Sequence, residues 1–510
     1  MTDIKWPSIE LKIIQGSLPH LKSYEKTTSI AVIGLFGFLV CLATSAEKTK
    51  AAKNNLKPAD IFRGTNIWTV RLTFTPEQWK AMEPRQGPRP ARPPGATGFS
   101  LQGPEGGRNG MMAAFGLIFD YVHADLEFGT NLFKDVGVRY KGNGTFFSSQ
   151  NTLKRSLKID LHQFVKSQNL GGMTQLNLHN SVRDPGSMNE SIAYGLFNKG
   201  GVPASRTAYA KVFVTVPGTH DKQYFGLYCL VEDVGKEFIE EKLAVKKGAL
   251  FKPVTPNLFD DLGDDWKNYK QTYDPKSEPA NEQKERVITF AKVVTKADDA
   301  EFAKKLPEFL DLDNFARYMA LTTWLVDMDG ILGVGQNYYL YLHPKTHKFM
   351  FFPWDQDQTF GQFPRGSTAE QRENLTIHRP WSSDSRFLER VFQSDEFKKL
   401  YLAKMQEFNS TILQPETIRA QVDQLAPVLR ESIRQESPER FAEFNKAVAG
   451  DMVNIPMGQV GLGGTPVKSI KGFVGPRHQS VQDQLAGKSQ GETIFSGFGR
   501  PPARRPPPAK

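Results

Sequence analysis

The stretch LVDMDGILGVGQNYYLYLHPKTHKFMFFPWDQDQTFG, residues 325–361, combines a short predicted hairpin with a high density of oxygen-bearing side chains. The runs QNYYLYLH and KFMFFPWDQD are rich in aromatic residues and flank a turn at residues 344–347, which predicts two antiparallel strands. Acidic and amide side chains lie near both ends of this unit: Asp327, Asp329, Asn337, Asp355 and Asp357. Because Mg²⁺ prefers such oxygen ligands, the stretch predicts a divalent cation site that serves a phosphate substrate.

The acidic pair that ends this stretch, Asp355 and Asp357, has two interpretations. In an extended chain their carboxylates share a face and repel each other unless a cation lies between them. Aspartates also favour turns and helix caps, which is the alternative. We predict that both bind metal, and we expect no histidine-based metal chemistry, because His162, His179 and His347 lack the spacing of a zinc site.

Upstream of this stretch, the chain first has the pattern of a strand-rich region. Alternating residues at 67–73 predict a strand, and Thr75-Pro76 begins a short helix. The segment KDVGVRYKGNGT predicts a strand that enters a glycine-bearing turn, and SLKIDLHQF predicts its returning partner. A second pair of strands, ASRTAYAKVFVTVPG and KQYFGLYCLVEDV, flanks a turn at residues 218–221.

Helical patterns follow these strands. Asp184 is expected to cap a helix whose first turn contains Pro185 and whose end is Gly200. Apolar residues then recur at i, i+3 and i+4 in long segments such as residues 300–326, and a last helix is expected at 470–485. We therefore predict an α+β protein in which an N-terminal β-rich lobe precedes a mainly helical C-terminal lobe.

Cations cluster around the first predicted hairpin. Arg139, Lys141 and the turn Gly142-Asn143-Gly144 offer positive charge and backbone N–H groups that can approach a phosphate closely. Lys158, on the returning strand, faces away from its apolar neighbours and can reach the α and β phosphates of a nucleotide. The alternative is that the run at 154–158 forms a solvated basic edge. The acidic residues downstream favour the nucleotide-binding role.

Three further side chains are candidates for the same site. Glu190 can pair with Lys158 as a lysine-glutamate lock, or it can be a surface glutamate. Glu232 either lies at a hinge beside the adenine or ribose, or is an ordinary carboxylate at a strand end. Lys252, in GALFKP, is a candidate nucleotide ligand, with an exposed lysine as the alternative.

The order of these segments resembles that of the CotH (spore coat protein H) kinase family. VGVRYKGNGT and KRSLKIDL are followed by RDPGSMNESIAYGLF, FGLYCLVEDV and GALFKP, and then by NYYLY and WDQDQTFG. An ordered set of this kind is more specific than any single motif. The resemblance extends over about residues 67–485, apart from a Pro/Gly-rich insert at 83–112 that we expect to be poorly ordered.

The resemblance implies an atypical protein-kinase-like fold that binds ATP and Mg²⁺ (or Mn²⁺) between two lobes and phosphorylates Ser or Thr hydroxyls of another protein. By motif, it implies Asp355 as the metal-binding aspartate, Asn337 as a second metal ligand and Asp329 as the catalytic aspartate. The loop between Asp329 and Asn337 is longer than is common in the family, so Asp327 remains an alternative. The competing functions are a non-catalytic coat or surface assembly module and a nucleotidyl or other phosphoryl transferase.

The composition excludes few functions. The chain of 510 residues has a formal net charge of +10, and much of the excess lies in low-complexity stretches. Such stretches favour solubility or contacts with anions, and no nucleic-acid-binding motif is present, so we expect no nucleic-acid partner. The two cysteines are Cys41, in an apolar run, and Cys229. A product cleaved after that run has no intramolecular disulfide.

The two ends of the chain predict processing and a tail. Residues 1–46 have the pattern of a leader with a signal peptide or an uncleaved signal anchor, with a buried core helix as the alternative. We therefore expect export to the periplasm, cell surface or medium, with membrane contact only if this segment stays uncleaved. A linker at 47–62, a kinase domain at 63–486 and a disordered basic, Pro-rich tail at 487–510 complete the predicted organisation.

Overall fold

The computed structural model of the chain describes residues 56–89, 101–364, 366–455 and 466–494. The predicted leader at 1–46 lies outside the described residues, as does the tail beyond residue 494. Among the residues that the structure describes, no helix has the length and apolarity needed to cross a bilayer.

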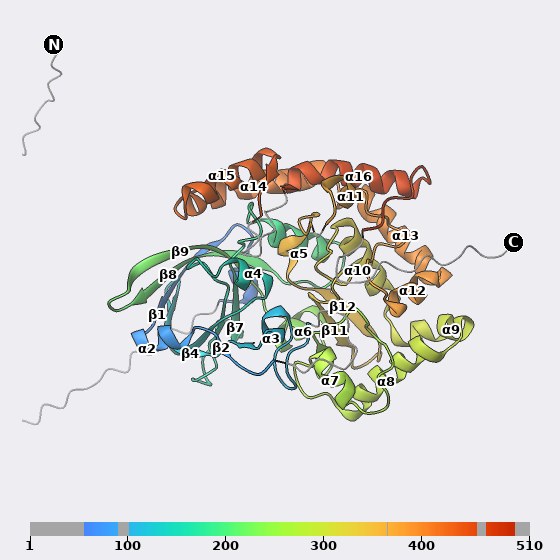
Figure 1. Cartoon of the computed structure of the whole chain (residues 1–510), viewed down its shortest axis with the longest axis horizontal. Coiled ribbons are helices and arrows are strands. Elements are labelled where there is room, and N and C mark those ends of the chain that lie inside the picture. The colour runs from blue at the N-terminus through green and yellow to red at the C-terminus, as the bar shows by residue number, and fades with distance from the viewer. Residues whose placement is uncertain (1–55, 90–100, 365, 456–465, 495–510) are drawn as a thin grey trace, which may run out of the picture. The chain divides into compact units, whose positions relative to one another are not determined.

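The N-terminal strands close into a barrel (Figure 1). Its strands are β1 (Ile67–Thr73), β4 (Val122–Phe128), β5 (Asn131–Tyr140), β6 (Leu157–Asp160), β7 (Gln175–His179), β8 (Thr207–Val216) and β9 (His220–Val231). They follow the order β1-β4-β5-β6-β7-β9-β8, and the parallel pairing of β1 with β8 closes the ring. The other neighbouring strands are antiparallel. Both predicted strand pairs are present, and in the first pair Arg139 lies opposite Lys158.

Short elements accompany the barrel: α1 (Pro58–Ile61), α2 (Pro76–Ala81), β2 (Arg85–Gln86), α3 (Met111–Ala114), β3 (Leu117–Ile118) and α4 (Gly144–Ser148). The predicted helix start is confirmed, because the Thr75 side chain accepts a hydrogen bond from the Gln78 N–H at 3.3 Å. Ile61 and Phe62 are buried in the barrel core, so residues 58–62 belong to the fold, although they were predicted as linker.

Part of the Pro/Gly-rich insert is also folded, contrary to the prediction of a poorly ordered loop. Strand β2 pairs with β3, and Asn109 is buried. The Asn109 side chain exchanges two hydrogen bonds of 2.6 Å with Gln271, one with its backbone oxygen and one with its side-chain amide. The end of the insert is therefore fastened to the helical part of the chain.

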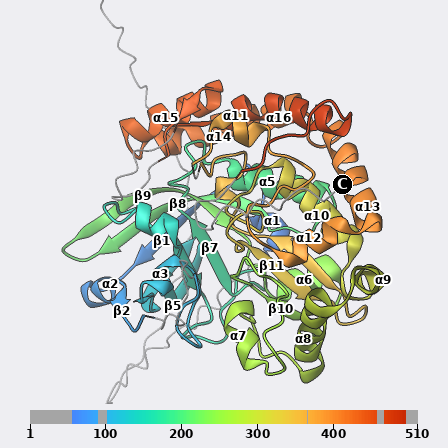
Figure 2. The same ribbon diagram turned by 45° about the vertical axis from the view of Figure 1, so that its right-hand side comes forward.

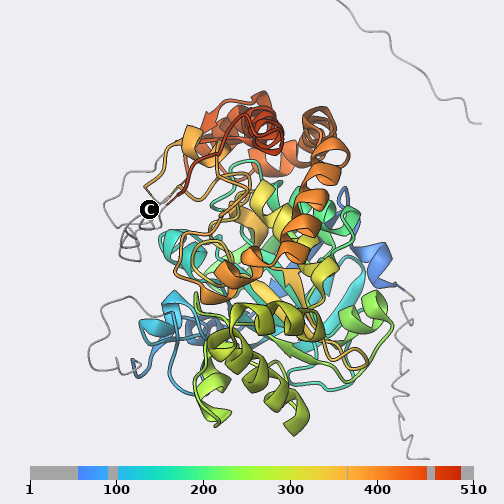
Figure 3. The same cartoon turned by 90° about the vertical axis from the view of Figure 1, so that its right-hand side faces the viewer.

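Helices make up most of the remaining chain: α5 (Asn189–Lys199), α6 (Lys236–Leu243), α7 (Lys267–Tyr273), α8 (Asn281–Lys296), α9 (Asp299–Phe309), α10 (Leu312–Trp324), α11 (Ala369–Glu373), α12 (Arg386–Gln393), α13 (Asp395–Ser410), α14 (Pro415–Arg434), α15 (Pro438–Ala449) and α16 (Ile470–Leu485). The segment predicted at 300–326 is divided at Asp311, which caps α10 by accepting the Asn314 N–H. Helices α14, α15 and α16 pack together, and α14 also contacts β9 (Figures 1 and 3).

The helix predicted from Asp184 begins later than expected. Helix α5 starts at Asn189, and Pro185 lies in the turn before it. Asp184 still accepts the backbone N–H of Asn189 at 2.7 Å, from five residues upstream. Gly200 ends the helix as predicted.

The hairpin predicted around residues 338–353 is present as β11 (Tyr338–Leu342) and β12 (Phe349–Pro353). A third strand, β10 (Ala249–Phe251), joins it in the order β10-β11-β12, and Figure 2 labels β10 and β11. Strand β12 packs against α10 (Figure 1). A small pair, β13 (Met452–Val453) and β14 (Val467–Lys468), lies near the end of the chain. Residues 487–494, predicted as tail, continue the fold, because Thr376 donates its N–H to the Glu492 oxygen and Ile494 is buried.

Strand β9 joins the two large apolar cores. Successive side chains of a strand point to opposite faces. Tyr228 and Leu230 therefore fill the barrel, whereas Leu227, Cys229 and Val231 pack into the core of the helical part. The β-rich and helix-rich parts thus share strand β9, whose two faces belong to different apolar cores.

Candidate functional site

A cavity of about 930 Å³ lies between the barrel and the sheet β10-β11-β12. Six of the residues singled out from the sequence line it: Arg139, Lys141, Lys158, Lys252, Asn337 and Asp355. Arg139, Lys141 and Lys158 come from the barrel, further lysines come from residues 236–276, and Asn337 and Asp355 come from the ends of the hairpin. The cavity therefore joins the two halves of the predicted site.

A glycine turn follows strand β5 and directs Lys141 into the cavity. Gly142 has a φ of 100°, and a Cβ atom there would lie 2.5 Å from the Thr145 hydroxyl oxygen. A Cβ atom on Gly144 would lie 2.9 Å from Nη1 of Arg183. Only glycine fits both positions without movement, so the turn keeps its backbone close to its neighbours.

Lys158 pairs with Asp233, whereas the sequence suggested Glu190 as its partner. Its Nζ lies 3.1 Å from Oδ1 of Asp233, and Asn177 donates to the same oxygen at 2.9 Å. Although burial opposes ionisation, Lys158 and Asn177 hold the pKa of Asp233 below its ordinary value. The contact forms because β6, β7 and the end of β9 are adjacent in the barrel.

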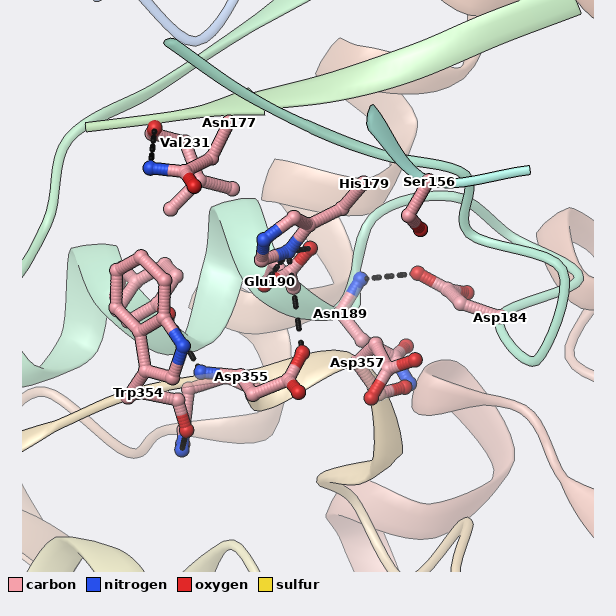
Figure 4. A network of polar contacts seen from close by, with 12 residues as sticks. Ser156, Asn177, His179, Asp184, Asn189, Glu190, Val231, Trp354, Asp355 and Asp357 are labelled. Atoms are coloured by element: carbon pink, nitrogen blue, oxygen red, sulfur yellow. Dashed lines mark hydrogen bonds and ion pairs between the residues drawn. The ribbon is translucent and has the colours of Figure 1, made fainter. Parts of the chain in front are cut away.

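Glu190 instead belongs to a chain of contacts through His179 (Figure 4). Nζ of Lys141 lies 2.5 Å from Nε2 of His179, and Nδ1 of His179 lies 2.8 Å from both Glu190 carboxylate oxygens. A histidine that accepts a hydrogen bond from Lys141 at Nε2 and donates Nδ1–H to Glu190 satisfies both contacts. The expected direct contact between Lys158 and Glu190 is therefore absent, and His179 instead connects Glu190 to Lys141.

Burial favours the neutral forms of the three side chains in this series of contacts, Lys141, His179 and Glu190. It lowers the pKa of Lys141 to about 7 and raises the pKa of Glu190 to about 8. Burial, aided by the positive charge of Lys141, lowers the pKa of His179 well below its ordinary value. An anion bound beside Lys141 would favour its charged form.

Trp354 lies near two half-buried lysines, Lys141 from the barrel and Lys252 from the residue after β10. The Nζ atoms of Lys141 and Lys252 each lie 5.2 Å from its ring centroid, within cation–π range. Burial, with the like charges of Lys276 and Lys141, lowers the pKa of Lys252 to about 7. Trp354 thus spaces the two cations along the cavity.

Asp355 follows Trp354 in a left-handed backbone conformation, with φ 55° and ψ 62°. Its N–H donates to the Tyr194 hydroxyl at 2.8 Å, which holds the turn against α5. The side chain is 38% exposed, in contrast to 6% for His179 and 3% for Glu190, with which it forms a group of possible metal ligands. Their ligand atoms lie within 4.8 Å of one another, and Asp355 is the member that is open to the cavity.

Asn337 and Asp329 are in direct contact. The Asn337 amide donates to the Asp329 carboxylate at 3.0 Å and to its backbone oxygen at 3.1 Å, and Gln358 donates to the same carboxylate at 2.8 Å. With its Nδ2 used in this way, Asn337 can offer Oδ1 to a cation. Asn337 is also left-handed, with a φ of 60°. Strained conformations of this kind cluster at functional sites.

Asp329 itself is buried and does not line the cavity, and the same holds for Asp327 and Asp357. Asp327 is 2% exposed and accepts a hydrogen bond from Gln356 at 3.1 Å. Burial, with the charge of Asp329, raises its pKa to about 8. The backbone after Asp355 turns into the 3₁₀ helix η1 (Gln356–Gln358), so Asp357 does not share a face with Asp355 as an extended chain would require. Its buried carboxyl, whose pKa is raised by burial, does not line the cavity.

Glu232 faces away from the cavity. Arg206 binds its carboxylate through Nε at 2.9 Å and through Nη2, and Glu232 is buried in this pair. Glu232 therefore does not line the cavity, whereas the next residue, Asp233, does. Sequence reasoning missed Asp233 and His179, although the alternation of side chains along a strand is a signal that separates Asp233 from Glu232.

A family model described as CotH kinase protein matches residues 138–455. The chain belongs to the CotH kinase family. The matched region contains the glycine turn, His179 with its partners Lys141 and Glu190, and the aspartates at 327–329 and 355–357. The match identifies a kinase-like protein of mixed α and β structure. A comparison with curated proteins found no match. The part of the insert that lines the cavity, Arg108 to Gly110, precedes the region that defines the CotH family.

Proposed function

We propose that this CotH family protein transfers the terminal phosphate of ATP, with Mg²⁺ or Mn²⁺, to Ser or Thr hydroxyls of another protein. One observation carries the proposal. A single cavity brings Lys141 and Lys158 of the barrel to the same space as Asp355 and Asn337 of the hairpin wall. Cations opposite oxygen ligands are what a metal-bound triphosphate requires.

The cavity lining combines polar and apolar side chains. Polar groups belong to the glycine turn, and Ile239, Val245 and Leu250 supply an apolar part from a segment that also places Lys236 and Lys246 in the lining. We assign the phosphates to the turn, Lys141 and Lys158, and the base to the apolar part. Backbone N–H groups of the glycine turn and the lysine ammonium groups would hold the phosphate oxygens.

In this proposal, residues at and behind the hairpin wall carry out the phosphate transfer. A divalent cation at Asp355 and Asn337 supplies charge neutralisation for the phosphates. The acceptor hydroxyl oxygen forms a bond to the γ phosphorus, the bond from that phosphorus to the bridging oxygen of ADP breaks, and Asp329 accepts the hydroxyl proton. Contact with Asn337 holds Asp329 beside the metal ligands, which favours it over Asp327 for this role.

The Asp355→Ala variant tests the metal assignment. With Mg-ATP and a generic Ser/Thr acceptor, the wild type should label itself or the acceptor, and the variant should lose at least about 10³-fold in rate because the cation loses its exposed carboxylate. Asp384, an exposed aspartate, gives the matched control Asp384→Ala, which should keep the wild-type rate. Full labelling by Asp355→Ala would refute the assignment.

Two further results separate the competing functions. The mass added to the acceptor distinguishes a phosphate from a nucleotidyl group. Nucleotide binding without any transfer would support a binding or assembly module in place of an enzyme. We also propose export of the protein, based on the apolar leader pattern at 30–43, and sequencing of the mature N-terminus tests it.

A further inference from the structure

Arg108 has a buried guanidinium nitrogen that no hydrogen bond among the described residues satisfies. It lies in the folded end of the insert, at residues 101–110, and lines the same cavity as Lys141 and Lys158. Its guanidinium stacks over the Phe119 ring at 4.8 Å, and Nη2 approaches the Gly142 oxygen at 3.4 Å. Nη1 is buried and has no hydrogen-bond partner within the described ranges.

A buried, unpaired guanidinium N–H is costly, so its position calls for an acceptor. Arg139 lies on the same wall of the cavity, and its like charge adds to the demand for an anion. Burial, with the charge of Arg139, lowers the pKa of Arg108 to about 9, and Asp274 opposes this only in part. The local balance of charge is therefore positive beside the glycine turn.

The segment that carries Arg108 is held at both ends of its span. On the barrel side, the Met112 N–H donates to the Asn143 side chain at 3.3 Å. On the helical side, Asn109 bonds to Gln271, and the Gly106 N–H donates to the Gln271 side chain at 3.0 Å. The segment thus connects the glycine turn to α7, and Arg108 lies between the anchors at Gly106 and Met112 in the sequence.

We propose that Arg108 is a phosphate-binding residue, which binds the polyphosphate chain of the nucleotide from the insert side, beside the glycine turn. The proposal rests on the proposed function and deepens it. The planar guanidinium is suited to phosphate, because two of its N–H groups can donate to two phosphate oxygens at once. Since Arg108 precedes residue 138, this chain adds a phosphate ligand from outside the family-defining region.

The experiment compares binding of Mg-ATP, Mg-ADP and adenosine to the full chain by isothermal titration calorimetry. Arg108→Gln should weaken ATP and ADP at least about tenfold and leave adenosine within about twofold, because only the phosphates lose a charged partner. Arg108→Lys should recover part of the loss. Arg85→Gln is the matched control from the same insert, since Arg85 is exposed and paired with Asp120, and it should bind all three ligands as the wild type does.

The outcomes separate this inference from the function on which it rests. If the wild type binds no nucleotide, the proposed function fails. If the wild type binds ATP and Arg108→Gln binds it equally well, only the role of Arg108 is overturned. Equal losses for ATP and adenosine, with a lowered melting temperature, would also overturn it, because they would indicate a purely structural arginine.

Discussion

The barrel meets the helical part at two junctions, and lysines from one short run of sequence lie at both. Lys154 reaches Glu436, after α14, at 2.7 Å, and Glu436 also accepts the Leu227 N–H at 2.7 Å. Lys158, four positions later, faces the cavity and pairs with Asp233. Both lysines have partners, but only Lys158 borders open space.

The junction at Lys154 is closed by further contacts of the same kind. Arg440 of α15 donates to the Ser187 hydroxyl at 2.6 Å and to the Asp184 oxygen at 2.7 Å, and the Tyr224 hydroxyl donates to the Ser432 oxygen at 2.9 Å. Charged groups that are buried and paired in this way hold two parts of a fold together. Charged groups that border a cavity retain capacity for a ligand, which is the physical distinction between the two junctions.

The largest effect is expected for Asp329, the proposed catalytic aspartate, which lies behind the cavity wall and contacts Asn337. Asp329→Asn should lower kcat about 10³-fold, because the acceptor hydroxyl loses its proton acceptor, and should leave Mg-ATP affinity nearly unchanged. Steady-state kinetics and calorimetry measure the two quantities. Asp327→Asn is the paired variant and should lose less than about tenfold. The reverse ranking would assign the role to Asp327.

At the closed junction, Lys154→Met should reduce the free energy of unfolding by about 3 kcal/mol, because it leaves Glu436 buried without its main partner. Urea denaturation followed by tryptophan fluorescence measures the change. Nucleotide affinity of the folded variant should match the wild type. If Lys154→Met lost tenfold in nucleotide affinity and kept its free energy of unfolding, the proposed difference between the two junctions would be wrong.

The same substitution four residues later should behave in the opposite way. Lys158→Met should weaken Mg-ATP binding about tenfold, because a charged phosphate partner is removed. The free energy of unfolding should change by less than about 1 kcal/mol, since Asp233 keeps its bond from Asn177 and its side chain is 24% exposed. Calorimetry and urea denaturation on one preparation give both values, and unchanged ATP affinity would contradict the assignment.

The last prediction concerns the pH dependence of stability through Asp327, whose pKa is raised to about 8 by burial. The folded protein keeps this carboxyl protonated, whereas the unfolded chain releases the proton above about pH 4. Its contribution to stability is therefore fully present below about pH 4 and declines as pH rises toward 8, by up to about 1.4 kcal/mol per pH unit. Asp327→Asn should flatten this decline in denaturation curves across that range. Asp384→Asn, at an exposed position, should keep the wild-type slope.

Local patterns in the sequence predicted the elements well and the partners of charged groups less well. The strand pairs, the helix at 470–485 and the hairpin before Asp355 all form as expected. Glu190 and Glu232 were assigned by their place along the chain, but Arg206 neutralises Glu232, and His179 lies between Glu190 and Lys141. These contacts connect side chains from different strands and helices, so no short-range pattern reports them.

Sequence alone determined which residue types are available and in what order: a glycine turn between cations, then amide and carboxylate groups around a hairpin. It also determined the family, because that order is specific. Tertiary structure decided which of those groups share a cavity. The turn after Asp355 removes Asp357 from it, closure of the barrel brings in Asp233, and folding of the insert adds Arg108. The physical reason is that secondary structure depends on neighbours along the chain, whereas the environment of a charge depends on everything packed around it.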